Sequence, residues 1–560
     1  MTQFNFKKYR PFAPISMPDR EWPNRQITQA PAWCSVDLRD GNQALIEPMN
    51  VEQKRALFDL LVKMGFKEIE VGFPSASQPD FDFVRSLIEG NAIPDDVTLQ
   101  VLVQAREALI ARTFEALKGC RRAVVHVYNS TSTVQREKVF KLDRKGIVDI
   151  AVQGAELVQR MSLDHPDTEW VFQYSPESFT GTELDFAIEV VDAVTNVWQP
   201  TPQKPCIINL PATVEMSTPN VYADQIEYFC KNIARRDSLI ISLHTHNDRG
   251  CAVAAAELGI LAGADRVEGT LMGNGERTGN TDLITMGMNM YSQGIDPKLD
   301  FSNMDEIIQV VKYCTQLPVH PRHPYAGDLV FTAFSGSHQD AIKKCLDLGG
   351  NDEQWDVAYL PIDPLDIGRD YQEVIRINSQ SGKGGVAYVL EQDYGIQMPR
   401  WLQIEFSRVV QSDAEMSSGE ISSERIYSLF KASYLDNDNA AMRLSGYNID
   451  RSDSIDHIEA KISSGGEEST IKGQAAGVVE AFVKALQDHS GEQIVLVEYN
   501  EHALSKSADS QAICYVQMNI GGTRYCAAAV SNDIIDASLS AIIGAYNRAG
   551  TMVQDEAKAG

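Results

Sequence analysis

Two histidines separated by one residue, His244 and His246, are the side chains best placed for metal chemistry in this sequence. On a β-strand, residues i and i+2 point to the same face, roughly 6.5–7 Å apart, so both imidazoles can bind one ion. A bare His-x-His pair is more often satisfied by local hydrogen bonds. Asp40 would complete a set of two histidines and one carboxylate, and Asn280 would be a weaker oxygen ligand or an outer partner. Without thiolates, this set does not discriminate among Mg²⁺, Mn²⁺ and Zn²⁺.

Three further side chains are candidates for charge stabilisation and proton transfer. Arg39 precedes Asp40, and its guanidinium can stabilise an enolate or alkoxide oxygen, although a surface salt bridge is the simpler interpretation. Glu177, in the segment Tyr-Ser-Pro-Glu, is a candidate acid or base, although carboxylates in such loops often cap helices. His338 lies outside the strands predicted below, so packing or capping is its default role. The glycine-rich stretch 381–385 lacks the spacing of a nucleotide-binding loop.

Short apolar runs alternate with helical patterns from Trp33 to Leu271, and this alternation predicts the elements that position these side chains. Eight such units in series predict a (β/α)8 TIM barrel, in which reactive groups gather at the carboxyl ends of the strands. His244, His246, Asp40 and Glu177 all follow or end a predicted strand. The eight predicted strands are Trp33–Asp37, Lys67–Gly72, Thr98–Val103, Ala123–Tyr128, Trp170–Tyr174, Cys206–Leu210, Leu239–His244 and Arg266–Leu271.

The chain is expected to divide into three parts: an N-terminal extension with the barrel (1–327), mostly helical linker subdomains (328–430) and a C-terminal α+β domain (431–560). The polar run 411–420 predicts a hinge before the last domain. Within that domain, the patterns predict strands at Ser454–Ser464, Gln493–Tyr499 and Ile513–Ile520, and helices at Ala476–His489 and Asp533–Ala549.

Composition points to a small-molecule enzyme. The 560 residues carry a formal charge of -27, which opposes binding to nucleic acid or anionic membranes. The nine cysteines form no C-x-x-C pair, so free thiols are expected. We expect no membrane span and no secretion signal, and therefore a cytoplasmic protein.

Five motifs together resemble the metal-dependent Claisen-condensing barrel family, which includes the 2-isopropylmalate, homocitrate and citramalate synthases and the hydroxymethylglutaryl-CoA lyases. Leu-Arg-Asp-Gly-Asn-Gln and His-Thr-His-Asn-Asp are shared broadly within that family. The closest likeness is to the longer type of 2-isopropylmalate synthase, and it runs through nearly the whole chain. Three motifs look specific to that leucine-pathway branch: Leu-Pro-Ala-Thr-Val-Glu-Met (210–216), Gly-Asn-Gly-Glu-Arg-Thr-Gly-Asn (273–280) and Ser-Gly-Ser-His-Gln-Asp-Ala (335–341).

The resemblance implies an acyltransferase that condenses acetyl-CoA with 2-oxoisovalerate and water to give 2-isopropylmalate and CoA, the first committed step of leucine biosynthesis. It implies that a divalent metal ion chelates the 2-oxo acid, with Arg39 polarising the keto group. The metal ligands that it implies are Asp40, His244 and His246, with Asn280 close by. The substrate-binding residues that it implies are His126, Ser175 and Thr213.

The resemblance also implies a domain-exchanged homodimer. Glu177 and His338 would take part in deprotonating the acetyl methyl group, and His338 and Tyr371 would come from the second subunit. Which group is the immediate base stays open.

The last domain resembles a leucine-sensing module but departs from its pattern at 473–477 and at 525–532, where alanines replace glycines, so leucine control also stays open. Two alternatives remain: a related alkylmalate synthase for citramalate or homocitrate, or an amino-acid-binding regulatory protein with a weak barrel.

Overall fold

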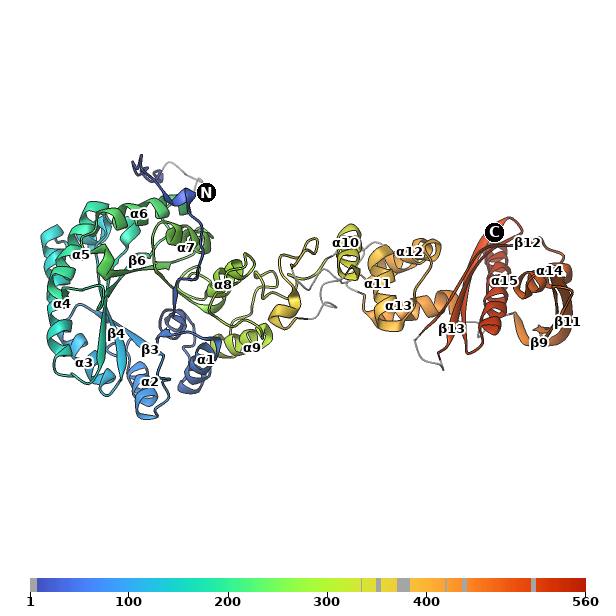
Figure 1. The fold of residues 1–560 in the computed structure, drawn as a ribbon, viewed down its shortest axis with the longest axis horizontal. Helices are drawn as coiled ribbons and strands as arrows, with labels where there is room; N and C mark the ends of the chain where they lie inside the picture. Colours follow the sequence, from blue (N-terminus) through green and yellow to red (C-terminus); the bar gives the residue numbers. More distant parts are fainter. Residues whose placement is uncertain are drawn as a thin grey trace. The chain divides into compact units, whose positions relative to one another are not determined.

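The computed structural model describes residues 8–333, 335–348, 354–369, 383–417, 421–435, 441–504 and 510–559. The chain forms two compact units. The first comprises Met1–Val330 with Pro364–Arg369, and the second comprises Phe331–Asp363 with Asp370–Gly560 (Figure 1). In the described residues, we find no helix whose length and apolar character would let it cross a membrane.

The first unit contains a closed barrel of eight parallel strands in sequential order, which confirms the predicted TIM barrel. Each predicted strand is present, with its ends shifted by a few residues. The strands are β1 (Ala32–Ser35), β2 (Glu68–Glu70), β3 (Thr98–Gln104), β4 (Arg122–Ser130), β5 (Glu169–Glu177), β6 (Cys206–Ala212), β7 (Leu239–Thr245) and β8 (Arg266–Gly269).

Helices follow the strands and surround the barrel (Figure 1). Local chemistry defines their ends well at α1, where Asn50 and Gln53 form the predicted capping box and Gly65 ends the helix in a left-handed conformation. The helices are α1 (Val51–Met64), α2 (Gln78–Glu89), α3 (Glu107–Leu117), α4 (Arg144–Ser162), α5 (Leu184–Trp198), α6 (Pro219–Asn232), α7 (Ala252–Leu261), α8 (Leu283–Tyr291) and α9 (Met304–Thr315).

Helices make up the start of the second unit. They are α10 (Gly336–Asp347), α11 (Lys383–Tyr394), α12 (Arg400–Ser417) and α13 (Ser423–Phe430). The expected hinge at 411–420 is wrong for residues 411–417, because α12 continues to Ser417. Val410 and Ala414 are buried on that helix, so packing stabilises a segment whose polar composition suggested a break.

The C-terminal domain consists of two three-stranded antiparallel sheets, each covered by one helix. Helix α14 (Val478–Ser490) packs on β10 and β11, and α15 (Ile534–Ala559) packs on β13 and β14 (Figure 1). The strands are β9 (Met442–Ser452), β10 (Ile455–Ser464), β11 (Glu467–Ala475), β12 (Ile494–Ala503), β13 (Ala512–Ile520) and β14 (Thr523–Ser531). Sequence patterns missed β9, β11 and β14. The first two are largely polar, and β14 contains three consecutive alanines, which have low strand propensity.

Candidate active site

The loop after β1 brings a cation and a carboxylate together at the carboxyl end of the barrel. It forms a π-helical turn, Asp37–Gly41, all of whose residues are buried. The Arg39 guanidinium donates from Nη1 to Asp40 Oδ1 at 2.8 Å and from Nε to Glu70. Burial opposes ionisation of Asp40, but the charge of Arg39 and a hydrogen bond from His244 outweigh it and hold the pKa of this carboxyl well below its usual range. Asp40 is therefore an anion at neutral pH.

The two histidines at the end of β7 face this anion, as the strand alternation predicted. Their ring centroids lie 5.2 Å apart. His244 Nε2 lies 3.2 Å from Asp40 Oδ2, and His246 Nε2 lies 3.7 Å from the same oxygen. Burial disfavours a charged His244, yet hydrogen bonds to Asp40 and Glu268 raise its pKa to about 9. Burial and the neighbouring His244 lower the pKa of His246 to about 4, so His246 is neutral at pH 7.

Asp40, His244 and His246 fit a divalent metal ion. Their potential ligand atoms all lie within 4.8 Å of one another, and all three residues are buried. His246 Nδ1 and Asn280 Oδ1 are buried atoms for which the described residues provide no hydrogen-bond partner. Buried polar atoms of this kind are normally satisfied, so an unsatisfied nitrogen and oxygen beside a carboxylate favour an ion as the missing partner.

The loop 273–280 holds Asn280 beside the histidines. Asn280 pairs with His246 through an isolated β-bridge, and its Nδ2 donates to Asn274 O at 3.1 Å. A Cβ at Gly275 would lie 2.2 Å from Asn280 Nδ2, and Gly279 has a φ of +101° with its Cβ position only 2.0 Å from Gly273 O. Both positions therefore require glycine, which explains the glycine spacing of this motif.

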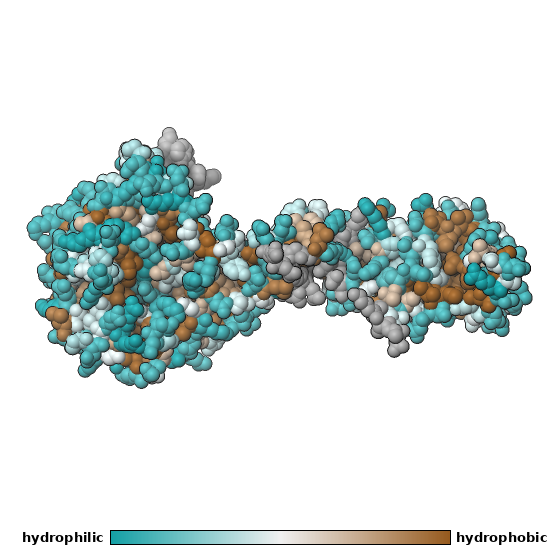
Figure 2. Space-filling model, in the orientation of Figure 1, coloured by the Kyte–Doolittle hydropathy of each residue, from teal (hydrophilic) through white to brown (hydrophobic). Residues whose placement is uncertain are grey.

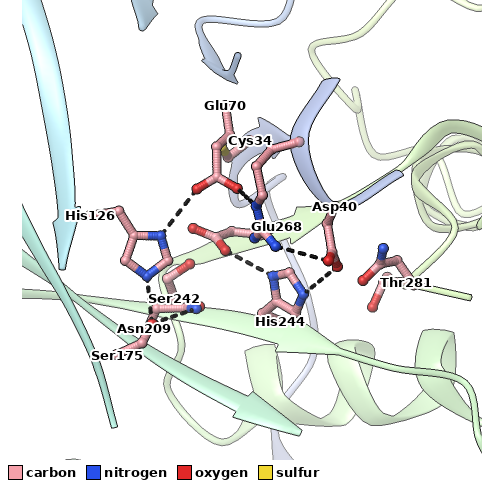
Figure 3. Close-up of polar contacts among 12 residues, drawn as sticks. Cys34, Asp40, Glu70, His126, Ser175, Asn209, Ser242, His244, Glu268 and Thr281 are labelled. Carbon is pink, nitrogen blue, oxygen red and sulfur yellow. Dashed lines mark hydrogen bonds and ion pairs between the residues drawn. The ribbon is translucent and has the colours of Figure 1, made fainter. Parts of the chain in front are cut away.

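A second group of side chains lies beside the metal candidates and is held by a chain of hydrogen bonds (Figure 3). His126 Nδ1 lies 3.1 Å from Glu70 Oε2, and His126 Nε2 lies 2.7 Å from Ser175 Oγ. Asn209 Nδ2 donates to the same Ser175 oxygen at 3.0 Å. Thr213 Oγ1 accepts from the backbone N–H of Ser178 at 2.9 Å.

One cavity of about 350 Å³ collects these groups. Glu177, which accepts a hydrogen bond from Ser130 Oγ, points its half-buried carboxylate at this cavity from the end of β5. The predicted site residues that line the cavity are Arg39, Asp40, His126, Ser175, Glu177, Thr213, His244 and His246.

Besides Asn280, whose contacts are described above, two predicted residues are not among those lining the cavity. His338 lies on α10 in the second unit, where its ring stacks on Tyr359 with centroids 3.9 Å apart. Tyr371 lies outside the described residues. Their proposed roles depend on a second subunit and are treated below.

Sequence reasoning missed several polar residues in and under the cavity. Asn209 lines it, and Gln100, Arg266 and Glu268 lie beneath its floor, each almost fully buried. All four belong to barrel strands. A polar or charged residue in a strand buried on both faces is uncommon, and this was the signal that would have identified them.

Family models cover nearly the whole chain. Residues 30–311 match the HMGL-like family, residues 328–391 match the "Alpha-isopropylmalate synthase, post-catalytic domain-like" family, and residues 420–550 match the "LeuA allosteric (dimerisation) domain". Among solved structures, an HMG-CoA lyase from Acenitobacter baumannii matches with a TM-score of 0.42 at 18% identity, over 53% of this chain and 94% of that chain.

Curated relatives are similar over almost their full length. The 2-isopropylmalate synthase of Parafrankia sp. (strain EAN1pec) is 56% identical over 552 residues, which are 97% of this chain and 97% of that protein. The 2-isopropylmalate synthases of Alcanivorax borkumensis and Rhodospirillum rubrum are each 56% identical, and each match covers 97% of this chain and 98% of the relative. Together with the cavity described above, these similarities show that the chain belongs to the 2-isopropylmalate synthase family.

Proposed function

We propose that this chain condenses acetyl-CoA with 2-oxoisovalerate and water to form 2-isopropylmalate and CoA, at the start of leucine biosynthesis. The observation that carries the proposal is one cavity lined by a metal-binding set, an arginine and a carboxylate, in a chain 56% identical to curated synthases. The reaction needs an electrophilic keto carbon, a base for the acetyl methyl group and control of the charge that develops on oxygen.

Asp40, His244 and His246 would hold the metal ion, with Asn280 Oδ1 beside them. A divalent ion supplies Lewis-acid polarisation of the keto group when it is bound. Arg39 lines the same cavity and is fixed by Asp40 and Glu70, so its positive charge would be held in place to stabilise the alkoxide as it develops. His126 and Ser175 would orient the substrate through hydrogen bonds, and Thr213 would line its binding site.

Proton transfer starts the reaction. A base removes a proton from the acetyl methyl group, and the resulting carbon nucleophile attacks the keto carbon of the oxo acid. The new carbon–carbon bond converts the keto oxygen to a hydroxyl once it takes up a proton. Water then hydrolyses the thioester, which releases a carboxylate and the CoA thiol. Glu177 is the candidate base within the cavity, and His338 of a second subunit is the other candidate.

Thiol release from acetyl-CoA tests this function. Purified full-length protein would be offered 2-oxoisovalerate, pyruvate and 2-oxoglutarate separately, with and without a chelator, and the products identified by mass. We expect chelator-sensitive release that is fastest with 2-oxoisovalerate. A preference for another oxo acid would assign a citramalate or homocitrate synthase, because one methylene changes selectivity by only about 1–3 kcal/mol. Absence of release with all three, with metal added back, would favour the amino-acid-binding alternative.

A homodimer is supported by the match of residues 420–550 to a dimerisation domain. The C-terminal domain also exposes large apolar side chains around β12–β14 and α15 (Figure 2). These are Val495, Val497, Val530 and Ile534. Exposed apolar side chains are typical of a protein–protein contact only where they lie together, so the match to the dimerisation domain carries the proposal of a homodimer.

We further propose that the dimer is domain-exchanged, with His338 and Tyr371 completing the partner's barrel. The division of the chain at 327/328 and 430/431 is part of this proposal. Mixing two inactive variants, His246→Ala and His338→Ala, tests the exchange after subunit re-equilibration. If each site uses both chains, mixed dimers contain one intact site, and up to about a quarter of wild-type activity returns. If each chain builds its own site, the mixture stays inactive.

Leucine is the proposed effector of the C-terminal domain, with a weakened response. Ala527 and Ala529 stand where the family pattern has glycine, and both are buried on β14. Their methyl groups fill space that a ligand or backbone would otherwise approach. We expect millimolar leucine to slow thiol release only slightly, and strong inhibition at micromolar leucine would contradict this expectation.

A further inference from the structure

A fully buried carboxylate, Glu268, lies directly beneath the candidate metal ligands (Figure 3). Its Oε2 accepts from His244 Nδ1 at 2.9 Å. Its Oε1 accepts from Arg266 Nη1 at 2.7 Å, from Gln173 Nε2 at 2.7 Å and from Gln100 Nε2 at 3.1 Å. Burial alone would raise the pKa of Glu268, but the charge of Arg266 and the contact with His244 hold it well below its usual range.

The donors around Glu268 fix the orientation of His244. Because every partner of Oε1 is an N–H group, the Glu268 carboxylate cannot rotate without leaving a buried donor unpaired. Its Oε2 is therefore held in place to accept from His244 Nδ1. That hydrogen bond keeps a proton on Nδ1, so Nε2, which lies 3.2 Å from Asp40 Oδ2, is the atom that gives up its proton when a metal ion binds.

The neighbouring histidine shows how the same arrangement can serve another purpose. His126 Nδ1 faces the buried Glu70, and Glu70 pairs with Arg39 much as Glu268 pairs with Arg266. The difference lies at Nε2, because that atom of His126 is hydrogen-bonded to Ser175 at 2.7 Å. Gln100 joins the two carboxylates, with its Nε2 2.6 Å from Glu70 Oε2.

We propose that Glu268 is a positioning residue of the metal site, which sets the tautomer and direction of His244 and strengthens it as a ligand. The proposal rests on the proposed metal-binding role of Asp40, His244 and His246. The proposed role predicts that metal affinity depends on the hydrogen bond that Glu268 Oε2 accepts from His244. The negative charge of a carboxylate beneath the barrel floor would not by itself be enough.

Glu268→Gln tests the proposal because the side chain keeps its shape. If its oxygen accepts from Arg266, its amide N–H₂ must face His244 Nδ1, which forces the ring proton to Nε2 and blocks the ligand atom. The reverse orientation would place the N–H₂ against three donors. We therefore expect the Kd for Mn²⁺, measured by calorimetry on the full-length protein, to rise about 10–100-fold.

Glu68→Gln is the matched control. Glu68 accepts from Nε of the same Arg266 at 2.6 Å, so this variant removes one negative charge from the same arginine without a contact between Glu68 and His244. We expect its Mn²⁺ affinity to stay within threefold of wild type. Its melting temperature reports the cost of weakening the Arg266 pair.

Each outcome has a defined meaning. Glu268→Gln with unchanged Mn²⁺ affinity, or Glu68→Gln with an equal loss, would overturn the positioning role. If Glu268→Gln does not fold, Glu268→Asp keeps the charge but withdraws the carboxylate, and it must still weaken Mn²⁺ binding. Wild-type protein that binds Mn²⁺ but releases no CoA would reject the proposed reaction while leaving this inference intact, whereas wild-type protein that binds no Mn²⁺ would overturn both.

Discussion

The barrel and the C-terminal domain bury different kinds of side chain. Beneath the barrel cavity, Arg39, Glu70, Arg266 and Glu268 are almost fully buried and joined in ion pairs. The C-terminal core is apolar and includes Phe482, Leu486 and Ile542. Replacing one partner of a buried ion pair leaves an uncompensated charge, whereas shortening an apolar side chain leaves a cavity. The buried ion pairs are costly to keep and belong to the proposed active site, whereas the apolar core contributes directly to stability.

The largest effect should follow from removing a metal ligand in the barrel. His246→Ala removes one of the three proposed ligands, so we expect kcat to fall about 10³-fold or more. The melting temperature without metal should change little, because the described residues give His246 Nδ1 no partner to lose. Thiol release and scanning calorimetry with and without Mn²⁺ measure both quantities. Retained turnover would remove the metal assignment.

Arg39→Lys tests whether a shaped cation is needed and not only a positive charge. Arg39 bonds Asp40 through Nη1 and Glu70 through Nε, and an ammonium cannot reproduce this planar geometry. We expect kcat to fall about 10²–10³-fold with a smaller change in KM for the oxo acid. Lys63→Arg, at an exposed pair with Glu306, is a control that should leave both constants unchanged. An Arg39→Lys enzyme with normal kcat would mean that any cation suffices.

The barrel and its rim could be predicted from sequence, and the floor could not. The alternation of apolar runs with helical patterns predicted the eight strands. The single residue between His244 and His246 predicted that both side chains lie on one face of a strand. The roles of Glu268 and Arg266 could not be predicted from their own strand, because their partners lie on other strands. These partners, Gln100, Gln173 and Glu68, are far away in sequence. Strand β14 could not be predicted for a related reason. Its pairing with β13 and its packing under α15 stabilise it as a strand, whereas its own alanines do not favour one.

Stability should fall with rising pH because of Asp37, a buried carboxyl in the loop after β1. Burial raises its pKa from 3.8 to about 7, although Ser35 Oγ and the Leu271 N–H bond it at 2.8 and 3.0 Å. The folded protein therefore keeps a proton that the unfolded chain releases above about pH 4. The contribution of Asp37 to the free energy of unfolding is therefore lost as the pH rises from about 4 to 7. The shift in the Asp37 pKa corresponds to about 4 kcal/mol.

Asp37→Asn should remove that dependence. In chelator, its melting temperature relative to wild type should rise by a few degrees as pH increases from about 5 to 8. Parallel melting curves for the two proteins across this range would mean that Asp37 is already ionised in the folded state.

The smallest effect on catalysis should come from the C-terminal core, where a matched pair of substitutions sharpens the contrast. Leu486 on α14 and Leu243 on β7 are both fully buried, and each leucine-to-alanine change should cost about 2–5 kcal/mol. Leu243 directly precedes His244, so its loss should also lower kcat, whereas Leu486→Ala should leave kcat unchanged well below the melting temperature. Calorimetry and thiol release at 20 °C separate the two effects. A fall in kcat for Leu486→Ala would show that the apolar core of the second unit is coupled to the barrel chemistry, because no proposed metal ligand or substrate contact lies on α14.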